Sequence, residues 1–261
     1  MGDPFGERGR DERKELTPDS PMTKFPLLEI CVETLDAALA AERGGADRIE
    51  LCENLQVGGV TPSTDLTRAV RSQVHIPVFA MIRPRAGDFL YSEMEFKQIV
   101  RDLAIAKGLG MDGVVLGLLR ADQRVNIQHT RTLVDLARPL PVTFHRAFDQ
   151  TPNLREALED VIGTGAARIL TSGGGPSAEQ GVAALAELVD AGRKRITIMP
   201  GGGISAVNIA RVLQATRAQE VHSGLSTVIP APRTDYAEFE KEVGKLAELL
   251  KSPSAVRHWK R

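Results

Sequence analysis

Short apolar runs rich in Val, Ile and Leu alternate, from residue 27 onward, with longer stretches whose apolar residues recur every three or four positions. The first pattern predicts buried β-strands, and the second predicts amphipathic α-helices. Strands are expected at residues 27–32, 48–51, 78–82, 113–117, 142–145, 168–171, 196–199 and 220–223. Helices are expected between them, the clearest at residues 34–43, 92–108, 153–163 and 205–215, and a closing helix at 236–251. The chain is therefore expected to repeat one strand–helix unit along its whole length.

Glycine marks the turn between a helix and the next strand in three segments, GGADRIEL (44–51), GMDGVVLG (110–117) and GAARILTS (165–172). A helix often ends on a left-handed residue, a conformation that glycine adopts most easily. Parallel strands joined by helices bury both faces of their sheet, and this number of units is typical of a closed barrel. An open doubly wound sheet is the alternative, but its Gly-rich dinucleotide turn is replaced after the first strand by CVETLD. We therefore predict an α/β fold of the TIM (β/α)₈ barrel type.

The chain has 261 residues, of which 42% are hydrophobic and 26% charged, a composition that suits one large globular domain. Residues 1–24 mix both charges with Pro and Gly, so a disordered tail is expected there. The barrel domain is assigned to residues 25–251, and residues 252–261 are expected to form a basic C-terminal tail.

The formal charge of -1 leaves no basic excess for a nucleic-acid backbone, so a bulk nucleic-acid binder is not expected. No apolar run approaches the roughly 20 residues of a membrane helix, and the N-terminus lacks the apolar stretch of a secretory signal. The two cysteines make no disulfide framework. These features predict a protein of the reducing cytoplasm without a membrane partner.

Chemistry in a TIM barrel gathers where the strands end, and the first two predicted strands end with the same Glu-x-Cys pattern. Side chains alternate along a strand, so Glu29 and Cys31 share one face, and so do Glu50 and Cys52. Neighbouring strands lie about 4.8 Å apart, which allows the two sulfur atoms to approach each other if the register permits. Two thiols are soft ligands suited to Cu(I), although buried cysteines commonly only pack. Cys31 and Cys52 are therefore candidate ligands of a copper ion.

Ionisable side chains also cluster after the third and fifth predicted strands. His145 is the best general acid or base, because the ordinary pKa of histidine lies nearest neutrality. Arginines there can bind carboxylates, so a purely structural salt-bridge network is the alternative interpretation. The candidate catalytic residues are Glu29, Glu50, Arg83, His145, Arg146 and Asp149.

Glycine-rich loops follow the sixth and seventh predicted strands, and a small polar loop follows the eighth. Exposed backbone N–H groups and a helix N-terminus favour an anion, although tight turns alone also need glycine. The predicted anion-binding residues, for a small anionic ligand, are Ser172, Gly173, Gly174, Gly201, Gly202, Gly203 and Ser223. The nine lysines fall in tails, helices or strand starts, which argues against a Schiff-base aldolase.

Several long segments resemble the CutC family of copper homeostasis proteins: LLEICVETLDAALAAERGGADRIELCENL, GGVTPS, IPVFAMIRPRAGDFLYS, PLPVTFHRAFD, RILTSGG and IMPGGGIS. The resemblance runs from about residue 27 to residue 227 and implies a cytoplasmic, oligomeric TIM barrel, a dimer or tetramer, that handles copper. Cys31 and Cys52 occupy the matching strand-end positions. The family tends to show His-Gly-Ser-Ala in the eighth strand, where this chain has His222-Ser223-Gly224-Leu225, so a ligand touching that loop would bind differently.

Two functional hypotheses follow. The first is a copper homeostasis protein that binds Cu(I) through the strand-end cysteines. The second is a TIM-barrel enzyme of unknown reaction, acting on a phosphorylated or carboxylated small molecule with His145, Glu29 or Glu50 as acid or base.

Overall fold

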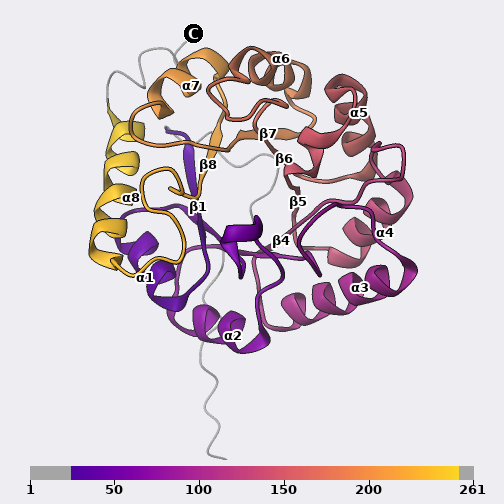
Figure 1. The fold of residues 1–261 in the computed structure, drawn as a ribbon, viewed down its shortest axis with the longest axis horizontal. Helices are drawn as coiled ribbons and strands as arrows, with labels where there is room; N and C mark the ends of the chain where they lie inside the picture. The colour runs from indigo at the N-terminus through magenta and orange to yellow at the C-terminus, as the bar shows by residue number, and fades with distance from the viewer. Residues whose placement is uncertain (1–24, 253–261) are drawn as a thin grey trace, which may run out of the picture.

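In the computed structural model, which describes residues 25–252, eight parallel strands are surrounded by a ring of helices (Figure 1). The strands are β1 (Leu27–Val32), β2 (Arg48–Leu51), β3 (Val78–Met81), β4 (Gly113–Leu116), β5 (Val142–Phe144), β6 (Arg168–Thr171), β7 (Thr197–Pro200) and β8 (Glu220–Ser223). The helices are α1 (Leu35–Arg43), α2 (Thr64–Gln73), α3 (Glu93–Gly108), α4 (Ile127–Ala137), α5 (Leu154–Thr164), α6 (Val182–Gly192), α7 (Ile209–Thr216) and α8 (Tyr236–Lys251). Short 3-10 helices, η1 (Leu55–Val57) and η2 (Arg146–Gln150), follow β2 and β5. The tail predicted at 1–24 lies outside the described residues, and so does the tail predicted at 252–261 apart from Ser252.

The first and last strands are hydrogen-bonded neighbours, because β1 pairs with β8 on one side and with β2 on the other. This closure confirms the TIM barrel and excludes the open doubly wound sheet. Only the β7–β8 seam lacks a ladder among the described strands. Across it, Ser223 Oγ donates to the carbonyl of Ile204, which follows β7, at 2.6 Å. Ser223 is thereby engaged in holding the seam.

The predicted strands agree with the observed ones to within one residue at each end. The predicted helix at 205–215 was wrong at its start, since α7 begins only at Ile209. The side chain of Asn208 accepts a hydrogen bond from the amide of Ser205 at 3.0 Å, which holds residues 205–208 in a turn. Short polar side chains often compete with the helix for backbone groups in this way. In the part of the chain that the structure describes, no helix has the length and apolarity to cross a membrane.

The alternation along each strand divides the protein into two interiors. Leu28, Ile30 and Val32 point outward and pack with the helices in the large apolar core. The inward side of the strands carries a small apolar cluster formed by Cys31, Cys52, Phe79, Met81 and Val115. The thiols therefore lie inside the barrel, with the sheet between them and the helices.

Charged side chains fill the barrel interior near the N-terminal ends of the strands. Arg48 donates to Glu29 and, at 2.5 Å, to Glu220, which also pairs with Arg168 at 2.9 Å. The guanidinium groups of Arg48 and Arg168 both stack against the Phe79 ring. Burial alone would raise the pKa of Glu29 and of Glu220. Arg48 and His222 outweigh it for Glu29, and Arg168 and Arg48 outweigh it for Glu220, so the pKa of each carboxyl group lies below its usual range. The two carboxylates are therefore ionised at neutral pH and share Arg48 as a counter-charge.

Replacing Arg48 with Met is expected to destabilise the protein by about 3–5 kcal/mol, because removing one partner of a buried ion pair leaves uncompensated charge behind. Urea denaturation of wild type and variant at neutral pH would measure the difference. The matched control is Arg195→Gln, which removes an exposed arginine paired with Glu159, and it should leave the unfolding midpoint essentially unchanged. A loss below about 1 kcal/mol in Arg48→Met would contradict the role given to this network.

Candidate functional site

A cavity of about 600 Å³ opens at the C-terminal ends of the strands. Its volume lies within the range of small-molecule sites, about 300–1,000 Å³. Of the six catalytic candidates, Glu50, Arg83, His145 and Arg146 line this cavity, and Glu29 and Asp149 do not. The structure therefore brings four of the predicted residues to one place.

The two cysteines approach each other as the Glu-x-Cys pattern suggested. Cys31 and Glu50 are paired across β1 and β2, and the sulfur atoms of Cys31 and Cys52 are 3.5 Å apart. Only Cys31 lines the cavity, whereas Cys52 is completely buried. Gly59, at φ +81°, covers Cys52 so closely that an added Cβ would lie 3.1 Å from its sulfur. The thiol pair is thus open to the cavity on the Cys31 side.

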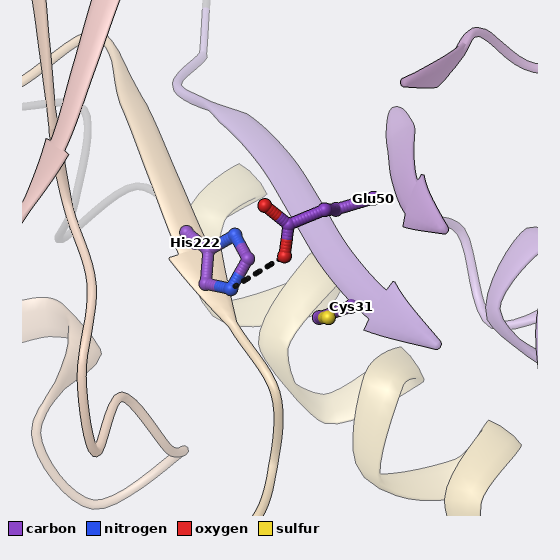
Figure 2. Close-up of side chains that lie close together, drawn as sticks. All are labelled: Cys31, Glu50 and His222. Atoms are coloured by element: carbon purple, nitrogen blue, oxygen red, sulfur yellow. Dashed lines mark ion pairs between the residues drawn. The ribbon is translucent and has the colours of Figure 1, made fainter. Parts of the chain in front are cut away.

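Cys31, Glu50 and His222 form a cluster in which one potential ligand atom of each lies within 4.8 Å of the others (Figure 2). His222 comes from β8, and its Nδ1 atom is hydrogen-bonded to Glu29 Oε1 at 2.7 Å. Its Nε2 atom faces Glu50 Oε2 at 3.8 Å. The other carboxylate oxygen of Glu50, Oε1, is buried without a hydrogen-bond partner among the described residues. The potential metal-ligand atoms of these three buried side chains therefore lie close together at the wall of the cavity.

The environment keeps the thiol of Cys31 protonated. Its hydrogen bond with Cys52, followed by burial, raises the pKa of Cys31 well above its usual value. Burial also raises the pKa of Glu50. For His222, burial is outweighed by the carboxylates of Glu50 and Glu29, so its pKa is raised. A metal ion binding here would displace protons.

His222 was not among the residues predicted for the site. Its signal was present in the sequence: in the strand EVHS, alternation puts Glu220 and His222 on the same face. The register then places His222 directly beside Glu29 of β1. Only the closure of β8 onto β1 reveals this contact, because the two residues are far apart in the chain.

His145 lies at the end of β5 with one ring nitrogen engaged and the other open. Its Nδ1 atom accepts a hydrogen bond from the amide of Ala147 at 3.2 Å, and Nε2 is buried without a partner among the described residues. Burial, reinforced by the charge of Arg83, lowers the pKa of His145 to about 3. The imidazole is therefore neutral at physiological pH.

The loop after β6 is already occupied by an internal anion. The carboxylate of Asp149 accepts from the amides of Ser172 and Gly174 at 3.1 Å, and the amide of Gly173 donates to Thr171 Oγ1. The amide of Gly201 donates to the carbonyl of Thr171. These backbone groups are not free for a ligand in this arrangement.

Gly202 and Gly203 differ, since both line the cavity and their amides have no hydrogen-bond partner within residues 25–252. Arg146 lies beside them, because a Cβ added to Gly202 would be 3.3 Å from its Cζ atom. Its guanidinium also pairs with Asp149 at 2.8 Å. Among the glycines predicted to bind an anion, the two whose amides are free to donate to a ligand thus lie in the loop after β7.

The CutC family model matches residues 26–227 of this chain. A mouse protein named copper homeostasis protein cutC homolog is 47% identical over 196 residues, which cover 75% of this chain and 72% of the mouse protein. A CutC family protein of Chromobacterium violaceum is 48% identical over 197 residues, 76% of this chain and 80% of the relative. Among solved structures, the CutC protein of Streptococcus agalactiae superimposes with a TM-score of 0.73 at 32% identity, covering 76% of this chain and 98% of that chain.

The buried imidazole makes stability depend on pH. The pKa of His145 is about 3 in the folded protein and about 6.5 when unfolded, so the unfolded chain binds more protons between these values. Stability is complete above pH 6.5 and falls as the pH drops, by up to about 1.4 kcal/mol per pH unit. His145→Asn retains an acceptor for Ala147 but cannot titrate, so its free energy of unfolding should fall less steeply below pH 6.5. Urea titrations from about pH 7 to pH 4 would measure both slopes.

The exposed His75 provides the control, and His75→Asn should keep the wild-type slope. Equal slopes in wild type and His145→Asn would mean that His145 takes up a proton in the folded state.

Proposed function

This chain belongs to the CutC family, and we propose that it is a copper homeostasis protein that binds Cu(I) through the thiolates of Cys31 and Cys52. The observation that carries the proposal is the 3.5 Å separation of the two sulfur atoms at the wall of an accessible cavity. Thiolates are soft ligands and favour Cu(I) over hard cations. A structural zinc site would call for four donors in tetrahedral geometry. The two thiolates by themselves therefore fit copper(I) better than a structural zinc ion.

His222 supports the same site as a third donor. Its Nδ1 atom is held by Glu29, so Nε2 is the nitrogen directed at Cys31 and Glu50. A ligand histidine is commonly oriented by a carboxylate on its other nitrogen. Glu50, next to Cys31, is positioned to accept a proton that leaves a thiol. Both side chains thus assist the exchange of protons for a metal ion.

The proposed environment follows from the ligands. Thiols and Cu(I) both persist under reducing conditions, so we place the protein in the cytoplasm. The homo-oligomer, a dimer or tetramer, remains a prediction from the family resemblance.

Anaerobic titration of the reduced protein with Cu(I) against a competing chelator tests the site. Wild type should compete for one copper ion, and the double variant Cys31→Ser and Cys52→Ser should lose affinity by more than the roughly 10–100-fold that loss of an outer-shell partner costs. Circular dichroism would establish that the variant is folded.

Val115→Ala is the matched control, because this side chain lies in the same apolar cluster as the two thiols and has no metal-binding atom. It should bind copper like wild type. Unchanged affinity in the double cysteine variant would refute the assignment of Cys31 and Cys52.

The affinity should also rise with pH. Because the pKa of Cys31 is raised, its thiol carries a proton at neutral pH that copper must displace. Each proton released makes binding about tenfold tighter per pH unit. Competition titrations from about pH 6 to pH 8, corrected for the chelator's own protonation, should show this slope in wild type and a shallower one in Cys31→Ser. A pH-independent affinity would contradict binding through thiolates.

A further inference from the structure

Two buried arginines line the cavity without a carboxylate partner. The side chains of Arg83 and Arg233 each have about 5% relative exposure. Within residues 25–252, neither guanidinium forms a salt bridge with a carboxylate. Buried charges in proteins are nearly always paired, because an unpaired charge is costly to remove from water. This pair of charges therefore calls for a partner.

The arginines are held in place by neutral groups only. Arg83 donates from Nη1 to the carbonyl of Gly59 at 2.9 Å and from Nη2 to that of Gly87 at 2.8 Å. Arg233 donates to the carbonyl of Cys31 at 3.1 Å and to that of Gly224. In both residues the Nε atom is buried and has no partner among the described residues. Arg83 also stacks over the Phe89 ring and Arg233 over the Phe239 ring. Each guanidinium is thus fixed in position without a carboxylate ion-pair partner and with one donor unsatisfied.

Two further buried atoms in the same cavity lack partners, Glu50 Oε1 and His145 Nε2. Neither atom is a guanidinium donor, and both are suited to hydrogen bonds with a hydroxyl or carbonyl group. The free amides of Gly202 and Gly203 add donors on the β7 side. Unsatisfied polar atoms in a native interior require an explanation, and a ligand in the cavity that Glu50, Arg83, His145 and Arg233 all line is one.

We propose that the cavity binds a small organic anion, a carboxylate or phosphate bearing hydroxyl or carbonyl groups, whose negative charge pairs with Arg83 and Arg233. Its uncharged part lies against the apolar lining supplied by Leu55, Met81, Phe89 and Leu170. Glu50 and His145 form hydrogen bonds with its hydroxyl or carbonyl groups. The amides of Gly202 and Gly203 donate hydrogen bonds to negatively charged oxygen atoms of the anion. The proposal does not depend on copper binding, since its charged partners, Arg83 and Arg233, are not proposed copper ligands.

Thermal unfolding of the reduced, copper-free full-length protein tests it with two dianions, inorganic phosphate and malonate, against chloride at equal ionic strength. A dianion that binds should raise the unfolding midpoint logarithmically once its concentration exceeds its Kd, by about 2–5 °C for each tenfold rise. Stabilisation by phosphate alone supports a phosphorylated ligand, and stabilisation by malonate alone supports a carboxylated one. Stabilisation by both supports a site for small anions of either kind. No stabilisation beyond chloride by either dianion overturns the proposal.

Variants distinguish anion binding in the cavity from anion binding on the protein surface. Arg83→Gln and Arg233→Gln should each lose the shift, whereas Arg83→Lys and Arg233→Lys, which keep the charge, should retain part of it. Arg195→Gln, on the outer surface, should shift like wild type. If one glutamine variant does not fold, the other glutamine variant and its lysine counterpart still test whether the arginine binds the anion. A full shift that persists in a folded glutamine variant overturns the assignment.

Discussion

The guanidinium of Arg48 is the charge on which the barrel interior depends. It lies between Glu29 and Glu220 and, together with His222 and Arg168, keeps both carboxyl groups ionised inside the sheet. An ionised Glu29 can only accept a hydrogen bond, so the proton on His222 is at Nδ1 when the ring is neutral. The lone pair of Nε2 then faces Glu50 and Cys31. A salt bridge near the N-terminal ends of the strands thus sets the chemistry near their C-terminal ends.

Ion pairs of this kind add little stability over an apolar core, because desolvation consumes most of the attraction. Here these ion pairs instead fix the positions of the side chains inside the barrel. The inward side chains change along the barrel axis, from the Arg48 and Arg168 layer stacked on Phe79 to the thiols and then to the cavity. The potential metal ligands Cys31 of β1, Glu50 of β2 and His222 of β8 come from three adjacent strands and line the cavity, and Arg83 follows the end of β3. One barrel mouth therefore presents two chemically distinct surfaces.

Local patterns predicted what depends on local geometry. Strand positions and the shared face of Glu29 and Cys31 followed from a period of two, and the barrel followed from the repeated strand–helix unit. Register is not encoded in that pattern, so neither the Arg48 pairing nor the position of His222 could be read from it. The same limit applies to the glycine loops. Asp149 reaches the amides after β6 from another element, and no spacing rule reveals that these donors are already used.

Arg233 connects the two surfaces, because it donates to the carbonyl of Cys31 while its charge faces the cavity. Gly59 covers Cys52, and Cys31 lines the cavity, so an ion entering from the cavity would reach the thiol pair past Cys31, through the space that an organic anion would occupy. A Cu(I) ion held by two thiolates carries one net negative charge. That charge would attract Arg233 and reduce the positive potential offered to an anion, and by linkage a bound anion would weaken copper binding equally. The two proposed ligands are therefore expected to oppose each other at one entrance, through a single shared arginine.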